Sequence, residues 1–424
     1  MFVWISTGGS HGDVHPFLAL GQTMQRRGHR VVLCVHPHFR DDVLAAGLEH
    51  SPIGEHVDVP AILNDPDLMH HRRGGGRVLD LILGSVPAGL RTLRDAWRND
   101  RPDVVVAHHI CIGVRWVCNE LHIPLALCTL APLLWFSPRD PVPVFQRRHG
   151  RAAAAIARAM LPCVKPLASW IVGRRVNRIR RQCGVAAERN AFWADMHGGD
   201  ALLGLWSPHY RAPTTADPPR SLVCGFTWYD RSDREPMLPP ELERFLSRGQ
   251  PPIVFSLGTA AVYHPGDYYH IAAETCQRLG RRGVLLVGKD ANAPPDLPAD
   301  ILPVHYAPFS LLLPRAAAVV QHGGIGSTAQ SLRAGCPQVV VPHAHDQFHN
   351  ALHVRRLGVG LNTPRVGLNA RKLAAALAPV ASDPAFRRHA DRLAGLLRNE
   401  DGARVASEAV EKLVADSAAR RGGA

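Results

Sequence analysis

Two regions of the chain repeat the same alternation of strand-like and helix-like patterns. In the first half, the apolar run Phe2–Ser6 is followed by a glycine-rich turn, a helical stretch with one apolar side, and a second apolar run, Arg30–Val35. The second half restarts at Ile253–Thr259, and Ala317–Gln321 leads into another glycine turn and helix. Near-continuous apolar runs alternating with amphipathic helices are typical of parallel sheets covered on both faces. The pattern predicts an α/β protein with two doubly wound, Rossmann-like domains.

The stretch between the halves marks the domain boundary. Arg211–Pro240 is rich in Pro, Asp and Arg, which is the composition of a linker or a domain-edge loop. We therefore expect a first domain over residues 1–215, a linker over 216–240 and a second domain over 241–400, with a helix and tail at 401–424 as a candidate to pack back on the first domain. Ligands of such sheets bind at the carboxyl ends of the strands, so both glycine turns should face a cleft.

Composition narrows the class of protein. Hydrophobic residues make up 46% of the chain and charged residues 20%, which is ordinary for a globular protein and excludes a disordered chain, a coiled coil or a collagen-like fibre. With 49 Lys and Arg against 36 Asp and Glu, the formal net charge is +13. This positive balance points to nucleic acid, an anionic membrane or a phosphate-bearing ligand as a partner.

Part of the positive charge is concentrated in one segment. Arg147–Arg181 contains ten Lys or Arg and no Asp or Glu, with apolar runs between them. A basic amphipathic helix can lie on an anionic membrane surface, and a charge run can equally be a solvated face, so both interpretations stay open. Nucleic acid is not expected, because the chain shows neither an aromatic-interleaved nor a zinc-binding module.

Cysteine usage and the first residues favour a cytoplasmic protein, with peripheral contact at the inner face of the membrane as an option. The nine cysteines are scattered without a C-x-x-C pair, so neither a disulfide framework nor a cysteine zinc site is expected. No basic residues precede the first apolar run, which therefore resembles a strand more than a signal peptide. The longest charge-free stretch, Leu121–Pro138, contains three prolines and a histidine and suits a buried strand and loop.

The strongest candidate site is the glycine turn Gln321-His-Gly-Gly-Ile-Gly-Ser-Thr328. Gly324 and Gly326 are free to take positive φ and to let a ligand approach the backbone. The amides at the start of the following helix favour an anion, and side-chain donors are added by His322, Ser327 and Thr328. This chemistry suits a pyrophosphate, although a tight strand–helix turn without a ligand explains the glycines as well.

A second motif follows about twenty residues later, in Pro342-His-Ala-His-Asp-Gln-Phe-His-Asn-Ala351. Asp346 and Gln347 offer an acceptor and an amide at the start of a helix, which suits the hydroxyls of a sugar. The clustered histidines His343, His345 and His349 also suggest a metal site, which we do not favour because metal sites usually show carboxylate and second-shell support at defined spacing.

The two motifs together resemble a known family. The run from His322 to Gly360 resembles the donor-binding region of family 1 nucleotide-sugar glycosyltransferases of the GT-B fold, and Gly9–Phe17 resembles the start of their acceptor domain. The resemblance extends to about residue 400 and is strongest to the subgroup of sterol glucosyltransferases, antibiotic glycosyltransferases and rhamnosyltransferases of rhamnolipid synthesis. It implies the GT-B fold, with two Rossmann-like domains facing a cleft.

The resemblance also assigns residues to the donor. Tyr306 holds the position of the aromatic residue that stacks on the nucleotide base, although many members have Trp there and Gln in place of Phe309. His322, the turn 324–328 and the pair Gly258-Thr259 match residues that contact the diphosphate. Asp346 and Gln347 match residues that contact the sugar hydroxyls. The full implied donor set is Gly258, Thr259, Tyr306, His322, Gly324, Gly326, Ser327, Thr328, Asp346 and Gln347.

Catalysis is expected in the first glycine turn. Many members of the family have a catalytic His there, whereas this chain has Asp13, as in the antibiotic and sterol subgroup. Asp13 could accept the proton of an acceptor hydroxyl, His11 is the alternative base, and Asp13 could also simply cap the first helix. His109, Trp135 and Phe136 are candidates to line the acceptor site, with Leu133–Phe136 and the Phe192-Trp193 region as apolar walls.

The predicted function is therefore an inverting glycosyltransferase. The donor would be a UDP- or dTDP-linked sugar of the glucose or rhamnose type, and the acceptor a hydroxyl of an apolar or lipid-like molecule. No cofactor and no metal are expected, because a helix terminus can take the place of a cation beside the diphosphate. A nucleotide-sugar epimerase on the same fold and a non-catalytic nucleotide-sugar-binding protein remain as alternatives.

Overall fold

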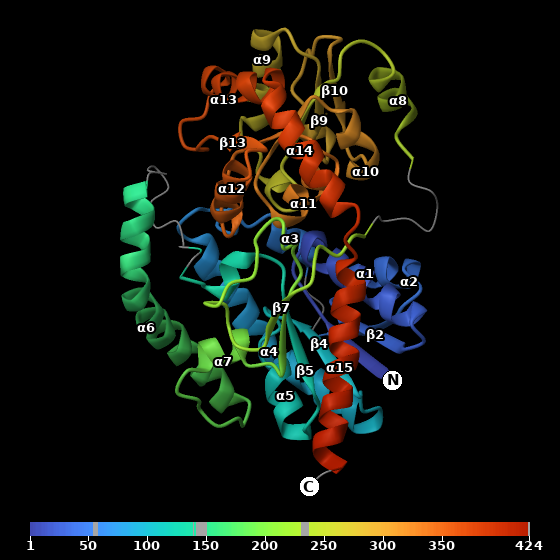
Figure 1. The fold of residues 1–424 in the computed structure, drawn as a ribbon, viewed down its shortest axis with the longest axis vertical. Coiled ribbons are helices and arrows are strands. Elements are labelled where there is room, and N and C mark those ends of the chain that lie inside the picture. Colours follow the sequence, from blue (N-terminus) through green and yellow to red (C-terminus); the bar gives the residue numbers. More distant parts are fainter. Residues whose placement is uncertain (54–57, 139, 141–150, 230–236, 423–424) are drawn as a thin grey trace. The chain divides into compact units, whose positions relative to one another are not determined.

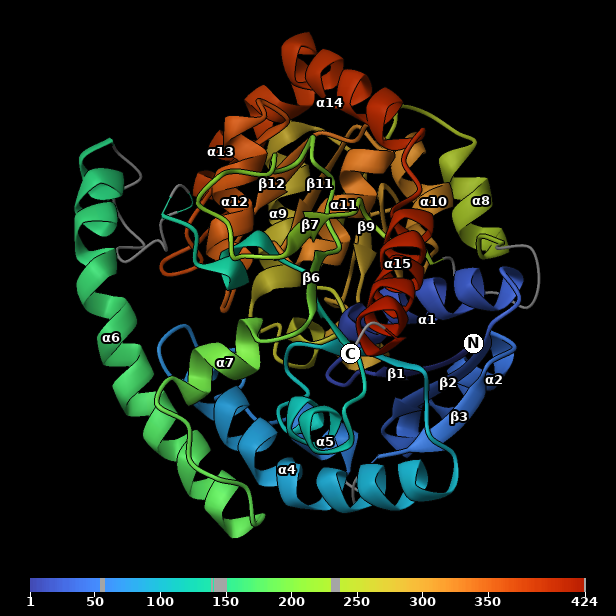
Figure 2. The ribbon, with the colours of Figure 1, turned by 60° about the horizontal axis from the view of Figure 1, so that its bottom comes forward.

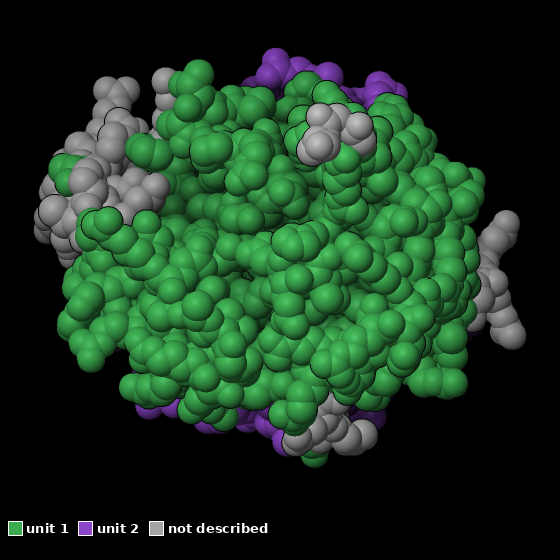
Figure 3. Space-filling view, turned by 90° about the horizontal axis from the view of Figure 1, so that it is seen from below, with its two compact units in different colours: residues 1–59, 76–229, 401–424 green, residues 60–75, 230–400 purple. Residues whose placement is uncertain are grey.

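The computed structural model describes residues 1–53, 58–138, 140, 151–229 and 237–422. The chain forms two compact units, which are coloured separately in Figure 3. Unit 1 contains residues 1–59, 76–229 and 401–424, and unit 2 contains residues 60–75 and 230–400. Each unit is built around its own parallel sheet, so the predicted fold class of two doubly wound α/β domains is confirmed.

Unit 1 is built on a seven-stranded, fully parallel sheet with the order β3-β2-β1-β4-β5-β6-β7. Its strands are β1 (Phe2–Ser6), β2 (Arg30–Val35), β3 (Glu49–Pro52), β4 (Val104–His108), β5 (Leu125–Thr129), β6 (Ala201–Gly204) and β7 (Ser221–Val223). The central strands are buried on both faces, which explains why their sequences are continuously apolar. β7 lies inside the segment expected to be a linker, because its three residues are too short to stand out among the surrounding prolines.

Helices cover this sheet, and the last of them comes from the far end of the chain. They are α1 (His11–Arg26), α2 (Arg40–Ala45), α4 (Gly74–Asn99), α5 (Val114–Leu121), α6 (Arg151–Gln182), α7 (Ala191–His197) and α15 (Gly402–Gly422). α15 packs along α1, as both ribbon views show (Figures 1 and 2). Glu411 of α15 binds Arg27 at 2.7 Å and His29 at 2.8 Å, which holds the two helices together.

Unit 2 is built on a six-stranded parallel sheet with the order β10-β9-β8-β11-β12-β13. Its strands are β8 (Ile253–Ser256), β9 (Gly283–Leu286), β10 (Ile301–Val304), β11 (Ala318–Gln321), β12 (Gln338–Val340) and β13 (Gly360–Asn362). Its helices are α3 (Val59–Leu63), α8 (Pro240–Leu246), α9 (Tyr268–Leu279), α10 (Phe309–Leu312), α11 (Ile325–Arg333), α12 (Gln347–Arg356), α13 (Ala370–Ser382) and α14 (Pro384–Leu397).

The core of unit 2 lies on both faces of this sheet. Phe255 and Val320 belong to one hydrophobic cluster, while their neighbours Val254 and Val319 belong to the other. Successive side chains of a strand point to opposite faces, so the alternation places a helix-covered core above and below the sheet. A sheet covered in this way exposes only its strand ends to ligands.

Both sheets reverse their strand order at one point, between β1 and β4 in unit 1 and between β8 and β11 in unit 2. Loops leave such a switch point in opposite directions and open a crevice at the carboxyl ends of the strands. In unit 1 the turn carrying Asp13 and the pair His108 and His109 follow these strands. In unit 2 Gly258 and His322 do so. The candidate residues therefore lie where this fold places ligands.

Candidate active site

The imidazole of His322 lies between two glycines in unit 2. A Cβ added at Gly258 would be 2.4 Å from Cε1 of His322, and one added at Gly324 would be 2.5 Å from Nε2. Gly258 also has φ +66°, a conformation that favours glycine. The ring thus fills the space that side chains at these positions would need. This packing explains why glycine is needed both at position 258 and at position 324, which lie far apart in the sequence but on either side of the same imidazole.

Burial also sets the charge of His322. Only 8% of the residue is exposed, and this burial lowers the pKa of the imidazole to about 4. The ring is therefore neutral near pH 7 in the free protein. Nδ1 forms no hydrogen bond to any described residue, which makes it a buried polar atom that a ligand or water has to satisfy.

The turn after His322 is clamped from two sides. The amide oxygen of Gln321 accepts a 2.6 Å hydrogen bond from the backbone N–H of Gly323, and its amide nitrogen donates to Oγ1 of Thr328 at 3.1 Å. From α12, Nδ2 of Asn350 donates to the carbonyl of Gly323 at 2.8 Å. Thr328 is fully buried in this network, so it supports the turn from inside. Gln321 and Asn350 were given no role from the sequence.

The positive φ in this turn belongs to a different glycine from the ones expected. Gly323 has φ +95°, whereas Gly324 has φ −60° and is the N-cap of α11. No side chain caps this helix, so its first amides are available to an anion. Gly326 has open space beside its Cα, and Thr259 is exposed after β8. Gly326 and Thr259 are therefore accessible to a ligand, and Ser327 is partly exposed.

The loop between β12 and α12 holds Asp346 and Gln347. The amide oxygen of Gln347 accepts hydrogen bonds from the backbone N–H groups of His343 at 2.8 Å and Ala344 at 3.0 Å. Its amide nitrogen is therefore the atom that could donate to a ligand hydroxyl. His345, inside the loop, has φ +56°, a backbone conformation that is unfavourable for a non-glycine residue.

Asp346 differs from an ordinary surface aspartate. Nδ2 of Asn350 donates to its carboxylate at 2.7 Å, and burial raises the pKa of the carboxyl to about 6 despite this bond. The same Asn350 amide group holds Gly323, so the candidate sugar-binding carboxylate and the candidate phosphate-binding turn share one clamp.

Two further residues lie near the carboxyl ends of this sheet. Tyr306 follows β10 and is 62% exposed, which leaves its ring accessible. Arg365 follows β13 and was not singled out from the sequence; it lies 3.6 Å from the position of a Cβ at Gly266. Burial, and after it the charge of Arg365, lowers the pKa of His343 to about 3. Arg365 thus adds positive charge to this end of unit 2.

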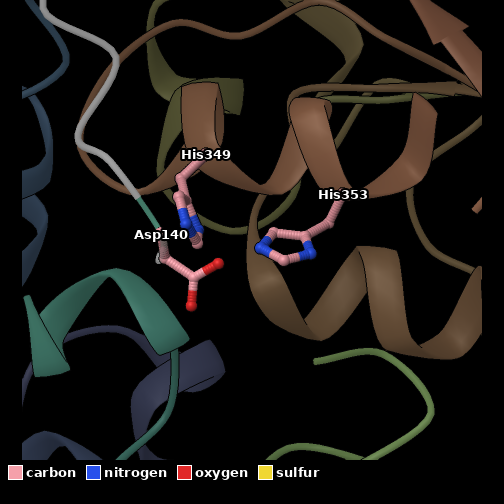
Figure 4. A group of neighbouring side chains, drawn as sticks. All are labelled: Asp140, His349 and His353. Carbon is pink, nitrogen blue, oxygen red and sulfur yellow. The ribbon is translucent and has the colours of Figure 1, made fainter. Parts of the chain in front are cut away.

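The histidines of the second motif do not gather into a metal site within their unit. Nδ1 of His343 contacts the carbonyl of Val341 at 2.7 Å. His349 and His353 project from successive turns of α12, with ring centroids 4.6 Å apart (Figure 4). Among the described residues of unit 2 taken alone, no three ligand atoms from His, Cys, Asp or Glu lie within 4.8 Å of one another.

Asp13 of unit 1 stands in the first turn of α1. Its Oδ2 accepts hydrogen bonds from the backbone N–H of Ser10 at 2.8 Å and from the Ser10 hydroxyl at 3.0 Å, so the carboxylate caps the helix. A Cβ at Gly9 would be 2.5 Å from Oδ2, which explains the glycine there. The charge of Asp13 also reaches Cys111, where burial first and this charge second raise the thiol pKa to about 12.

His11, the alternative base, faces a different carboxylate. Its Nε2 lies 3.4 Å from Oδ2 of Asp42, a buried residue of α2. The imidazole also packs edge-on against Phe39 with ring centroids 5.0 Å apart. His11 and Asp13 thus share the first turn of α1 but have separate surroundings.

His108 is the last residue of β4, and His109 follows it at the carboxyl end of the strand. Their rings meet edge-on with centroids 4.4 Å apart. Both residues are buried, and burial lowers the pKa of His109 to about 4 and that of His108 well below its usual range. Both rings are therefore neutral near pH 7.

The candidate acceptor residues Trp135 and Phe136 have different surroundings. Trp135 is only 1% exposed and packs on Trp206 with ring centroids 4.4 Å apart, so it contributes to the core. Phe136 has φ +48° and contacts Trp193 of α7 edge-on at 4.9 Å. Phe192 and His197 contact the same tryptophan at 4.8 Å and 5.7 Å. We call Phe136, Phe192, Trp193 and His197 the α7 aromatic cluster.

Each half of the chain matches a family of known proteins. Residues 3–121 match the glycosyltransferase family 28 N-terminal domain, and residues 284–416 match the C-terminal domain of erythromycin biosynthesis protein CIII-like proteins. The chain is 32% identical to O-mycaminosyltylonolide 6-deoxyallosyltransferase of Streptomyces fradiae over 97% of both chains. It is 26% identical to a sterol 3-beta-glucosyltransferase of Arabidopsis thaliana over 95% of this chain and 66% of that enzyme.

Solved structures show the same fold. The glycotransferase of kitacinnamycin superposes with a TM-score of 0.76 at 24% identity, covering 97% of this chain and 98% of that one. The glycosyltransferase VinC, solved in complex with dTDP, superposes with a TM-score of 0.69 at 18% identity over 98% and 100% of the two chains. The chain therefore belongs to the GT-B glycosyltransferases that use nucleotide sugars, in the group that includes the antibiotic glycosyltransferases and the sterol glucosyltransferases.

Proposed function

We propose that the enzyme inverts the anomeric centre of a UDP- or dTDP-linked sugar of the glucose or rhamnose type while transferring it to a hydroxyl of an apolar or lipid-like acceptor. The observation that supports the donor half is the enclosed imidazole of His322 beside the uncapped start of α11. A neutral ring with an unsatisfied nitrogen and a row of free amides match the oxygens of a diphosphate.

Donor recognition is divided among three parts of unit 2. The diphosphate contacts His322 and the first amides of α11, with Thr259 and Ser327 adding hydroxyls. The sugar contacts Asp346 and the amide nitrogen of Gln347, and the exposed ring of Tyr306 stacks on the base. The dTDP found with VinC makes a thymidine donor the first to test. Arg365 adds a positive charge that would attract the diphosphate.

The acceptor is assigned to unit 1. The α7 aromatic cluster supplies partly exposed rings, which suit an apolar acceptor, and His109 lies at the end of the neighbouring β4. Trp135 supports this region from the core. Asp13 accepts the acceptor proton as the hydroxyl attacks the anomeric carbon, and the nucleoside diphosphate leaves from the opposite face.

The decisive experiment measures transfer with and without an acceptor. The purified protein is incubated with dTDP- and UDP-linked glucose and rhamnose and with a panel of apolar alcohols, and the anomeric configuration of the product is determined by NMR. Transfer with inversion is expected and should persist in EDTA, because helix amides stabilise the leaving diphosphate. A product that retains the donor configuration, or donor epimerisation without transfer, would contradict the proposal.

A further inference from the structure

One face of α6 exposes large apolar side chains to solvent. Leu167, Trp170 and Ile171 are 56%, 60% and 48% exposed, and they lie within two helical turns. No other helix among the described residues groups three exposed large hydrophobic side chains in this way. Contiguous exposed apolar surface of this kind marks a binding face more often than a solvated one.

Arginines continue the same face toward the end of the helix. Arg174 and Arg178 follow Leu167 by seven and eleven residues, a spacing that places them on its side of the helix, and Arg181 follows three residues later. All three are exposed. The guanidinium of Arg174 lies 5.1 Å from the ring of Trp170. Among the described residues no carboxylate lies within ion-pair distance of these three arginines. We call Leu167, Trp170, Ile171, Arg174, Arg178 and Arg181 the outer face of α6.

The opposite side of α6 is occupied by unit 1 itself. Val176 is fully buried, Arg175 forms an ion pair with Asp80 of α4, and Nδ2 of Asn177 donates to the carbonyl of Glu188 at 2.9 Å. α6 also packs against α7, as the ribbon shows (Figures 1 and 2). The helix is therefore anchored to unit 1 on one side, and its outer face is exposed.

We propose that the outer face of α6 docks on an anionic lipid surface. Tryptophan and aliphatic side chains beside arginines on one helix face are the features of a helix that lies in the plane of a membrane interface. Between Asp140 and Glu188 the sequence contains no Asp or Glu, so the whole segment is attracted to negative charge. None of the described helices is long and apolar enough to cross a membrane, which leaves peripheral contact.

Charge argues against a second copy of this chain as the occupant. A twofold interface would place the same face against itself and bring the two rows of arginines together without acids to compensate. Nucleic acid would contact the arginines but would leave the exposed aliphatic side chains Leu167 and Ile171 without an apolar partner. An acidic protein partner remains as the alternative that the experiment has to separate from lipid.

The experiment is flotation of the full-length protein with phosphatidylcholine vesicles, with and without phosphatidylglycerol. Binding should require phosphatidylglycerol and fall as salt is raised to about 0.5 M, since screening shortens the reach of the charges. Each arginine near an anionic surface contributes about 1 kcal/mol, which is about fivefold in partitioning. The double variant Arg174→Glu and Arg178→Glu should therefore lower binding at least about 25-fold.

A matched control tests whether net charge alone explains the binding. Arg388 and Arg392 are exposed on α14 with the same four-residue spacing, and their double replacement by Glu should keep most of the binding. Trp170→Ser should weaken flotation, and Leu396→Ser, at a 44% exposed position of α14, should not. All variants should unfold at the same temperature as the parent and should transfer sugar to a water-soluble acceptor at the same rate. No flotation would overturn the proposal and leave an acidic protein as the alternative partner. Equal flotation with pure phosphatidylcholine would also overturn it, because the arginines would then have no role in binding.

Discussion

The turn after β11 and the turn after β1 each follow a strand at the switch point of its sheet, but they hold their polar side chains differently. In unit 2 the imidazole of His322 is enclosed by Gly258 and Gly324, and the turn is clamped by Gln321 and Asn350. In unit 1 the carboxylate of Asp13 is held through Ser10 of its own helix start.

This difference matches the two tasks proposed for the turns. A diphosphate is common to all nucleoside diphosphate sugars, and a rigid turn that matches it need not change from one such donor to another. Acceptors differ widely, so the acceptor side needs only a base in a local cap, while nearby rings such as those of the α7 aromatic cluster can vary. Four substitutions test this contrast.

The largest effect is expected in unit 1. Asp13→Asn keeps an oxygen that can accept from Ser10 but removes the base, so the turnover number should fall about 10²–10⁴-fold while donor affinity stays near parental. Steady-state kinetics and calorimetry with dTDP or UDP measure the two quantities separately. If turnover stays at the parental rate, Asp13 is only a cap and His11 becomes the next candidate.

In unit 2 the enclosure itself can be broken. Gly324→Ala would place a methyl group 2.5 Å from Nε2 of His322 and should displace the ring, lowering donor affinity about 100-fold. Gly326→Ala is the matched control for folding, because no heavy atom lies within 4 Å of its added Cβ. It should unfold at the same temperature as the parent or higher. Parental affinity in Gly324→Ala would refute the enclosed-ring interpretation.

The charge of His322 gives a pH test. The free ring has a pKa of about 4, and a bound diphosphate should raise that pKa by favouring the protonated form. Donor affinity should then rise as pH falls from 8 to 6, by up to about tenfold per pH unit. The variant His322→Gln keeps an uncharged hydrogen-bonding side chain that cannot be protonated. It should therefore weaken binding of the nucleotide sugar roughly 10- to 100-fold and abolish the dependence of its affinity on pH. If the affinity of the parent protein for the donor does not change with pH, the His322 ring stays neutral in the complex.

The smallest effect concerns stability. Since burial raises the pKa of Asp346 to about 6, the folded chain binds its proton more tightly than the unfolded chain does. Ionising this carboxyl therefore costs stability as pH rises from about 4 to 6, and the cost stays constant above. Asp346→Asn should raise the free energy of unfolding by roughly 1–3 kcal/mol at pH 8 and by little at pH 4.

Denaturant unfolding at the two pH values measures this difference. Asp416→Asn, at an exposed position of α15, is the control and should change stability far less at either pH. An Asp346→Asn variant that is no more stable at pH 8 than the parent would mean that the carboxyl is better solvated than its burial indicates.

The sequence predicted the fold class and located the turns that carry the proposed donor residues. Strand-like runs and glycine turns depend on local backbone chemistry, so the turns after β1, β8 and β11 could be located from their residues. The positions of Gly258, His322 and Gly324 also carried a family resemblance. Their mutual packing, however, joins strands distant in sequence and appears only in three dimensions.

Other features had no usable sequence signal. Gln321 and Asn350 act through hydrogen bonds across the turn, and an isolated amide side chain in a sequence carries no information about its partner. Trp135 belonged to an apolar run that suited a pocket wall, but its ring is buried against Trp206. The positive φ at Gly323 in place of Gly324 or Gly326 depends on the contact with α12.

The packing of α15 against α1 has a consequence for how the protein is made. Unit 1 contains both the first strand and the last helix of the chain, and Glu411 joins them through Arg27 and His29. On the ribosome, β1 and α1 emerge before unit 2, yet the helix that packs on α1 is translated after every residue of unit 2. Unit 2 can therefore complete its sheet during synthesis, while the surface of α1 stays uncovered until α15 has left the exit tunnel.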